Sequence, residues 1–233
     1  MTKHRYQQYC GLARALDVAG DRWTLLIVRE LAFGPRRFTD LIDGLPGISR
    51  NLLTERLRHL EGDAVIVRQE LPPPAARQVY ELTDEGRELA EAMIPLVAWG
   101  TRRLGERKPG ESFRTQWAAL AMATFADREA AIGVSETYQY VVGPTAFHFA
   151  VEDGSIELRY GQADNPAVTV TTDEETWADL SSGKTSGSAA ATAGALTIDG
   201  DARAVARLGR ILGRSRVLAH AERLRAAPPR SRQ

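Results

Sequence analysis

The side chains whose types and spacing could do chemistry gather between residues 49 and 61. Their polar members fall on one side of a helix, where they could pair with base edges or phosphates of a nucleic acid. These residues are Ser49, Arg50, Asn51, Thr54 and Arg58. Leu53, Leu57 and Leu60 recur at helical spacing and predict that the opposite side is buried. Ser49 is expected to cap the helix with its hydroxyl. The stretch therefore predicts a helix that contacts nucleic acid with one side and the core with the other.

Four further arginines flank this helix. Arg36 and Arg37 precede it, and Arg68 and Arg77 follow it. Arginine pairs readily with phosphate oxygens, so these residues are candidate contacts to a nucleic-acid backbone. For Arg68 and Arg77 the alternative is that they are ordinary solvated residues of two strands.

Residues suited to catalysis or metal binding are scattered. His4, His59, His148 and His220 do not have the spacing of metal ligands, and Cys10 has no second cysteine to pair with. The sequence also lacks a glycine-rich phosphate loop and a nucleophile elbow. We therefore expect no enzyme, no cofactor and no metal.

The positions of the candidate contacts depend on a series of short helices. The sequence predicts helices over residues 12–18, 23–31 and 36–42, the second of them capped by Asp21. The third is joined to the helix of residues 49–61 by a tight turn. Two short helices joined in this way, the second amphipathic, are typical of a helix-turn-helix.

The pattern after Glu61 changes from helical to extended. Residues 65–70 and 77–82 predict the two strands of a hairpin, with a proline-rich tip at 72–76. A hairpin directly after a recognition helix is a wing that reaches the DNA backbone. Thr83 is expected to cap the next helix, and Pro95 to split it. The surplus apolar surface of that helix indicates a second subunit.

These residues together resemble the HxlR-type winged helix-turn-helix regulators, over about residues 8–105. The resemblance implies a homodimeric transcription factor whose first and last helices form the dimer. It also implies that the helix from Ser49 lies in the major groove of double-stranded DNA, with two half-sites per dimer. The matching runs are Asp17–Leu31, Gly34–Phe38, Leu45–Ser49, Leu53–Leu57 and Tyr80–Gly86, followed by Trp99.

Two positions depart from the pattern of that family. Its members usually carry glycine where this chain has Ala64, so the entry to the wing is expected to turn differently. Their early cysteine is usually followed by proline, whereas Cys10 is followed by Gly11. Several members sense electrophiles or oxidants through that cysteine. Cys10 is therefore a candidate redox site, and the alternative is a buried and inert residue.

Charge divides the 233 residues into three parts. Residues 1–108 carry 17 basic and 15 acidic side chains, residues 109–213 carry 7 and 14, and residues 214–233 carry 6 and 1. The sequence predicts a DNA-binding and dimerisation domain over 1–108, a second domain over 109–213, and a basic tail that is helical and then disordered. An acidic second domain would repel phosphates, so DNA contact should belong to the first.

Membrane and export signals are absent from the pattern of residues. No apolar run approaches the roughly 20 residues that span a bilayer, and no signal segment is recognisable. We therefore expect a cytoplasmic protein without membrane contact.

The second domain alternates between helical and extended patterns. Phe147, Phe149 and Val151 share one face of a strand, and Asp153-Gly154 predicts a tight hairpin turn. The whole predicts an α+β domain, an antiparallel sheet with helices on one side. Strands are expected near 138–142, 147–151, 156–160, 168–171 and 196–198, and helices near 113–125, 174–180, 185–193 and 202–212.

Residues 112–213 resemble the sterol-carrier-protein fold. The resemblance rests on spaced turns and apolar positions, among them Val151–Gly154, Asn165–Val170, Ser182–Lys184 and Leu196–Asp201. Proteins of that fold hold lipids or other apolar molecules between sheet and helices. The candidate cavity residues are Trp117, Phe125, Phe147, Phe149 and Trp177. The alternative is a filled core that serves only dimerisation.

The favoured hypothesis is a homodimeric DNA-binding transcriptional regulator modulated by an apolar small molecule in its second domain. One alternative is an apolar-ligand carrier whose winged domain only dimerises. Another is an electrophile or redox sensor that acts through Cys10.

Overall fold

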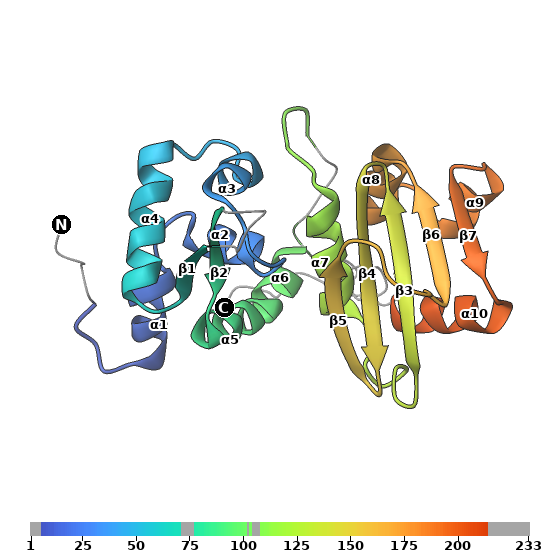
Figure 1. Ribbon diagram of the computed structural model, residues 1–233, viewed down its shortest axis with the longest axis horizontal. Helices are drawn as coiled ribbons and strands as arrows, with labels where there is room; N and C mark the ends of the chain where they lie inside the picture. The colour runs from blue at the N-terminus through green and yellow to red at the C-terminus, as the bar shows by residue number, and fades with distance from the viewer. Residues whose placement is uncertain (1–5, 71–76, 102, 104–107, 214–233) are drawn as a thin grey trace, which may run out of the picture. The chain divides into compact units, whose positions relative to one another are not determined.

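The helices and strands of the computed structural model belong to two compact units, Met1–Pro95 and Leu96–Gln233. The structure describes residues 6–70, 77–101, 103 and 108–213 (Figure 1). The expectations for the wing tip at 72–76 and for the tail at 214–233 lie outside these residues. Helix α6 (Ile94–Thr101) contains the division between the units. The domain limits 1–108 and 109–213 stay predictions.

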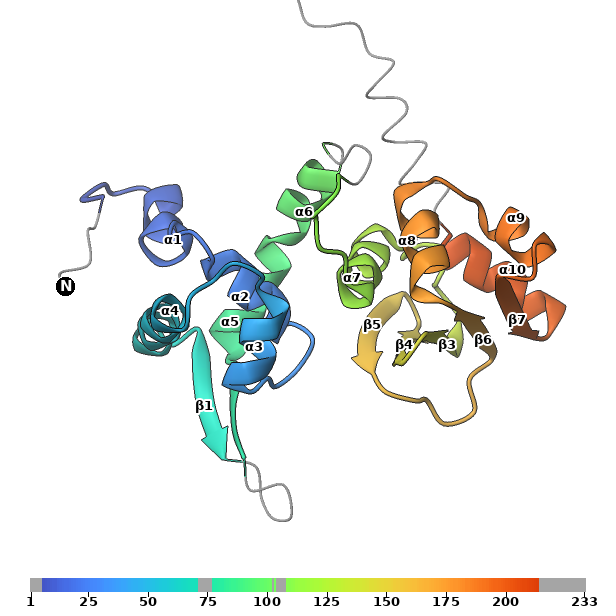
Figure 2. The same ribbon diagram turned by 90° about the horizontal axis from the view of Figure 1, so that it is seen from above.

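The first unit has the predicted winged helix-turn-helix arrangement. Helices α3 and α4 are joined by a short turn, and an antiparallel hairpin follows α4 directly. Figure 2 shows β1 projecting from the helices of the unit. The elements are α1 (Gly11–Ala19), α2 (Thr24–Leu31), α3 (Phe38–Gly44), α4 (Arg50–Gly62), β1 (Ile66–Glu70), β2 (Gln78–Leu82) and α5 (Asp84–Ala92).

The core of the first unit lies between α2, α3, α4 and the hairpin. Leu53, Leu57 and Leu60 of α4 are at most 1% exposed, as their spacing predicts. They belong to one apolar cluster with Ile27 of α2 and Leu41 of α3. Burying a leucine side chain contributes about 1.5–3 kcal/mol, so this cluster fixes how α4 is rotated about its own axis.

The predicted cap on α2 is wrong. The N-cap residue is Trp23, which has a left-handed backbone with φ of 83° and no side-chain cap bond. The carboxylate of Asp21 instead accepts a hydrogen bond of 2.5 Å from the guanidinium of Arg56 on α4. An ion pair with a residue 35 positions away has replaced the local bond to the helix end, and it connects the start of α2 to α4.

The base of the wing is joined closely to α5. Thr83 caps α5 by accepting a hydrogen bond from Gly86 N–H, and its hydroxyl lies 2.6 Å from the carbonyl oxygen of Ala64. A Cβ atom added to Gly86 would lie 2.1 Å from the carbonyl oxygen of Val65. Only glycine allows this approach. Helix α5 ends at Ala92 and α6 begins at Ile94, which confirms the break expected near Pro95.

Residue 64, at the entry to the wing, is an alanine with a backbone conformation typical of glycine. Ala64 has φ of 57°, in the left-handed region. The alanine thus adopts a conformation that glycine enters freely. The expectation of a different turn at this position stays a prediction.

The second unit is built on a five-stranded sheet with the order β5-β4-β3-β6-β7. Helices cover one face of it, as Figure 2 shows. The elements are α7 (Thr115–Phe125), β3 (Ser135–Val142), β4 (Thr145–Glu152), β5 (Ser155–Tyr160), β6 (Val168–Thr172), α8 (Glu174–Ser182), α9 (Gly187–Thr192), β7 (Leu196–Gly200) and α10 (Ala202–Ile211).

The sheet is mixed, which corrects the expectation of an antiparallel sheet. Strands β3 and β6 pair in parallel, with Tyr138 opposite Val168. Helix α7 lies against β5 at one edge of the sheet, and the chain after β5 crosses the uncovered face through residues 161–167 to join β3 on its other side. We call this crossing segment the strap. Such a crossing brings β6 in along the same direction as β3.

The core of the second unit lies between the sheet and its helices. Tyr138 is fully buried on the helix face, and its hydroxyl donates a 2.7 Å hydrogen bond to Glu136. Glu136 also accepts two hydrogen bonds from Arg207 of α10. The Arg207 guanidinium holds the pKa of the Glu136 carboxyl below its usual range. This ion pair fastens α10 to the sheet.

Replacing Ala64 with glycine should stabilise the first unit. A left-handed backbone destabilises the folded state by roughly 1–2 kcal/mol for an L-residue but not for glycine. Glycine also stabilises the unfolded chain by roughly 0.5–1 kcal/mol through its greater conformational entropy, which offsets part of this gain. We expect Ala64→Gly to raise the free energy of unfolding by up to about 1 kcal/mol in urea titrations. Ala206→Gly, in the exposed middle of α10, should instead lower that of its own unit by about 1 kcal/mol. A lower free energy of unfolding for Ala64→Gly would contradict the idea that the left-handed backbone of Ala64 is strained.

Candidate nucleic-acid interface

Helix α4 presents its predicted polar residues to solvent. Ser49 caps the helix by accepting a 3.2 Å hydrogen bond from Leu52 N–H, as expected. The buried leucines on the other side leave one outward surface, and all the predicted contact residues on it are exposed. They are Ser49, Arg50, Asn51, Thr54 and Arg58. We call this set the α4 surface. The five predicted contact residues therefore lie together on one surface of the folded unit.

Two members of the α4 surface have contacts of their own. Thr54 donates its hydroxyl hydrogen to the carbonyl oxygen of Arg50 at 2.9 Å. The guanidinium carbon of Arg50 lies 5.9 Å from the centre of the Phe38 ring, within range of a cation–π interaction. Among the described residues, neither Asn51 nor Arg58 has a side-chain hydrogen bond or ion pair. Their donors and acceptors are available to a ligand.

The two arginines before α3 have different surroundings. Arg36 forms a short bridge with the wing strand, in which its N–H donates to Tyr80 O at 2.9 Å and its carbonyl accepts from Tyr80 N–H at 2.8 Å. Arg36 is half-buried. Arg37 is exposed and precedes α3, where its N–H donates to the Asp40 carboxylate at 3.0 Å. The bridge ties the start of α3 to the wing.

The wing carries the last two predicted contacts. Arg68 on β1 is exposed and lies opposite Tyr80 in the hairpin, and Arg77 is exposed just before β2. Val67 beside Arg68 is 38% exposed, and β1 is exposed from Val67 to Glu70. This stretch of β1 is therefore open to a partner, whereas Ile66 at its start and Tyr80 and Leu82 on β2 belong to the core.

Cys10 is exposed and stands immediately before α1. The alternative of a buried residue is therefore wrong. Its carbonyl oxygen accepts a hydrogen bond from Arg14 N–H at 3.0 Å. A redox role for this thiol stays a prediction.

The five candidate cavity residues of the second unit divide into two groups. Phe147, Phe149 and Trp177 are at most 4% exposed, and the Phe147 ring centre lies 5.8 Å from that of Phe149 and 5.7 Å from that of Trp177. Trp117 and Phe125 on α7 are half-buried. The first group forms an aromatic cluster with Tyr140, so ring atoms occupy this part of the space between sheet and helices.

Two pockets of the second unit lie on the opposite face of the sheet. Two adjoining pockets of about 480 and 420 Å³ are lined by residues of β3, β4, β5 and the strap. None of these residues is among the sequence candidates. The available signal was the alternation on β4, where small or polar residues stand between the buried aromatic ones.

The described residues contain neither a membrane-spanning helix nor a metal cluster. No helix among them is long and apolar enough to cross a membrane. No group of three or more histidine, cysteine, aspartate or glutamate side chains in residues 6–70, 77–101, 103 and 108–213 is placed to hold a metal ion.

Comparison with known families divides the chain in the same order. Residues 18–108 match the HxlR-like helix-turn-helix family, and residues 118–213 match the SCP-2 sterol transfer family. A solved structure of the reduced form of the transcriptional regulator YodB from Bacillus subtilis is 32% identical, with a TM-score of 0.37. That alignment covers 45% of this chain and 100% of YodB.

Two relatives each match about two fifths of the chain. An uncharacterized HTH-type transcriptional regulator of Mycobacterium tuberculosis is 42% identical over 101 residues, which is 43% of this chain and 63% of that protein. The chain thus spans less than two thirds of that relative's length. The HTH-type regulator YvaP of Bacillus subtilis is 38% identical over 88 residues, which is 38% of this chain and 82% of YvaP. The chain belongs to the HxlR-like helix-turn-helix family and carries an SCP-2 domain in its second half.

Proposed function

We propose that the protein is a DNA-binding transcriptional regulator that recognises its operator with α4. The observation that carries the proposal is the α4 surface, which is exposed along a helix whose other side is buried. A helix held in this way can enter a major groove with its polar side chains leading. The relatives described as HTH-type transcriptional regulators support the same function.

Base recognition is assigned to Arg50, Asn51, Thr54 and Arg58 of the α4 surface. Asn51 and Arg58 lie seven residues apart, two helical turns, and so point in the same direction. Arginine and asparagine side chains can each make two hydrogen bonds to one base, guanine and adenine respectively. Arg37, Arg68 and Arg77 are assigned to phosphates, which position the protein without reading sequence.

A homodimer is part of the proposal, and apolar surfaces that the described residues leave uncovered support it. Helix α1 has nine residues and only Ala13 is buried, whereas Leu12 is 69% exposed and Leu16 is 39% exposed. An isolated helix of this length is marginal in water, so α1 needs a partner to pack against. Leu96 and Trp99 of α6 are also nearly half exposed. We assign α1 and α6 to contacts with a second copy, which would present two α4 surfaces to two half-sites.

The SCP-2 domain is assigned the role of an effector domain for an apolar molecule. The match to a sterol transfer family supports this role. The aromatic cluster occupies part of the space between sheet and helices, so a ligand there must displace Phe147, Phe149 or Trp177, or enlarge the space beside them. Binding would alter DNA affinity only if the ligand prefers one arrangement of the protein.

Arg50→Ala and Arg58→Ala should each weaken specific DNA binding by about 1–3 kcal/mol, roughly a 5- to 150-fold change in affinity. Binding is measured by mobility shift across a salt series, first with the DNA upstream of the protein's own coding sequence. Arg87→Gln is the control, because it removes the same charge from the same unit but lies on α5, where Arg87 pairs with Asp84. Unchanged affinity of both α4 variants would contradict base recognition by α4.

Leu12→Glu combined with Leu16→Glu should convert the dimer to a monomer. Two carboxylates placed in a small apolar contact would be buried without partners, which is strongly unfavourable. Sedimentation equilibrium measures the mass. The control is Val67→Glu, which puts the same acid at an exposed apolar position of the wing. A double variant that stays dimeric would remove α1 from the interface.

Oleate should bind the second unit and change operator affinity by about 5- to 150-fold, the usual range of coupling between sites. Titration calorimetry measures oleate binding, and the mobility shift is repeated with oleate present. Oleate that binds without changing DNA affinity would contradict coupling. Absence of binding would contradict an effector of the fatty-acid class.

A further inference from the structure

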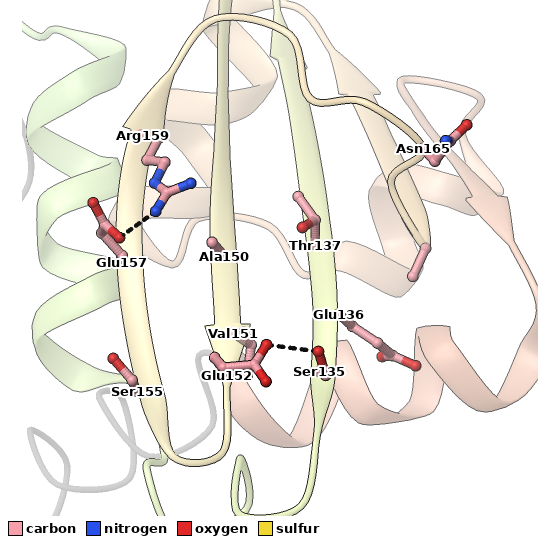
Figure 3. A pocket seen from close by; sticks show the side chains of 11 residues that line it. Ser135, Glu136, Thr137, Ala150, Val151, Glu152, Ser155, Glu157, Arg159 and Asn165 are labelled. Carbon is pink, nitrogen blue, oxygen red and sulfur yellow. Dashed lines mark hydrogen bonds and ion pairs between the residues drawn. The ribbon is translucent and has the colours of Figure 1, made fainter.

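The uncovered face of the sheet in the second unit contains a polar hollow (Figure 3). The two pockets described above share Thr137, Ala150 and Arg159, and together they form this hollow. Ala150 lies at its centre, between Thr137 on β3 and Glu157 on β5. Its methyl group is the smallest side chain in that row and leaves room for a ligand over β4.

The strap forms a fixed wall of the hollow. Gln139, which is 2% exposed, accepts a 2.6 Å hydrogen bond from Ala163 N–H through its side-chain oxygen. The side-chain nitrogen of Gln139 donates to Phe147 O at 2.8 Å, so the amide is held from both ends. Ala167 N–H donates to Thr137 O at 2.8 Å. The wall is therefore tied to β3 at two points and the hollow exists before any ligand arrives.

The hollow has a guanidinium at one end and a carboxylate at the other. Arg159 lies at the end beside the strap, opposite His148 across β4 and β5, and Glu157 and Asp164 also line this end. Glu152 lies at the other end, between Ser135 and Ser155. His148 and Glu152 are four residues apart on one strand, a distance of about 13 Å at about 3.3 Å per residue. A ligand that satisfies both ends must be elongated and carry a charge at each end.

Both charged ends keep capacity for a ligand. Arg159 donates one hydrogen bond of 2.7 Å to Glu157, out of five N–H donors on a guanidinium. Glu152 accepts one hydrogen bond of 2.6 Å from Ser135, whereas a carboxylate has about four acceptor positions. Figure 3 shows Arg159 and Glu152 at opposite ends of the group of labelled side chains, with Ala150 between them.

We propose that this hollow binds a short peptide of two or three residues, with its carboxylate at Arg159 and its ammonium group at Glu152. An extended tripeptide spans at most about 10–11 Å between its ends, which the side chains of Arg159 and Glu152 can bridge. Hydroxyl and amide side chains along the hollow suit peptide groups and disfavour an apolar molecule. They are Ser135, Thr137, Ser155 and Asn165. The site lies on the face opposite the aromatic cluster, and peptide binding there does not depend on the proposed DNA-binding function.

The ends of the peptide are tested by titration calorimetry on the full-length protein with trialanine. The free peptide should bind, and N-acetylation or C-amidation should each weaken binding by about tenfold or more, because each removes a charge-assisted contact. Doubly blocked trialanine binding as tightly as the free peptide would overturn the proposal. So would the absence of binding by free trialanine at about 10 mM, which corresponds to less than roughly 3 kcal/mol of affinity.

Variants locate the binding in the hollow. Ala150→Phe should abolish binding by filling the hollow, while the buried neighbours Phe149 and Val151 point to the other face. Arg159→Gln should weaken the free peptide about tenfold but leave the C-amidated peptide unchanged. Thr171→Phe is the control, since Thr171 is exposed on the same face of β6 and does not line either pocket. Melting curves establish that each variant folds. Wild-type binding by Ala150→Phe or Arg159→Gln would overturn the proposal.

Discussion

Helix α4 can bury its leucines in only one rotation about its axis, and the outward surface of the first unit depends on that constraint. Leu53, Leu57 and Leu60 are at most 1% exposed, and turning any of them to water would forfeit about 1.5–3 kcal/mol. The ion pair between Arg56 and Asp21 resists the same rotation from the side of the helix. The polar residues of α4 are consequently held outward by the core behind them.

In the second unit, the alternation of side chains along a strand decides which residues are buried, as helical spacing does in α4. A strand alternates its side chains between two faces, so β4 supplies Phe147 and Phe149 to the aromatic cluster and His148 and Ala150 to the polar hollow. One strand thus contributes to two chemically opposite surfaces. Substitutions on the hollow side leave the core packing in place, which makes the two surfaces separable by mutation.

Local patterns in the sequence were enough for much of this structure. The Ser49 cap, the leucine spacing of α4, the hairpin strands and the turn at Asp153-Gly154 each depend on residues a few positions apart. The order of the strands does not. Alternation predicts that β6 is a strand but says nothing of its neighbour, and the strap that places it beside β3 is held by Gln139 from 24 residues away. The cap expected from Asp21 failed for the same reason, because a distant arginine bound it.

The contact between Gly86 and the wing has a mechanical consequence. The space between the start of α5 and the base of β1 is too small for a single carbon atom, and Thr83 bonds the carbonyl oxygens on the wing side of the gap. Helix α5 and the wing base therefore cannot slide past one another and must move together as one rigid body. A small tilt at the far end of α5, where the chain continues into α6, would be delivered to the wing as an angular displacement of Arg68.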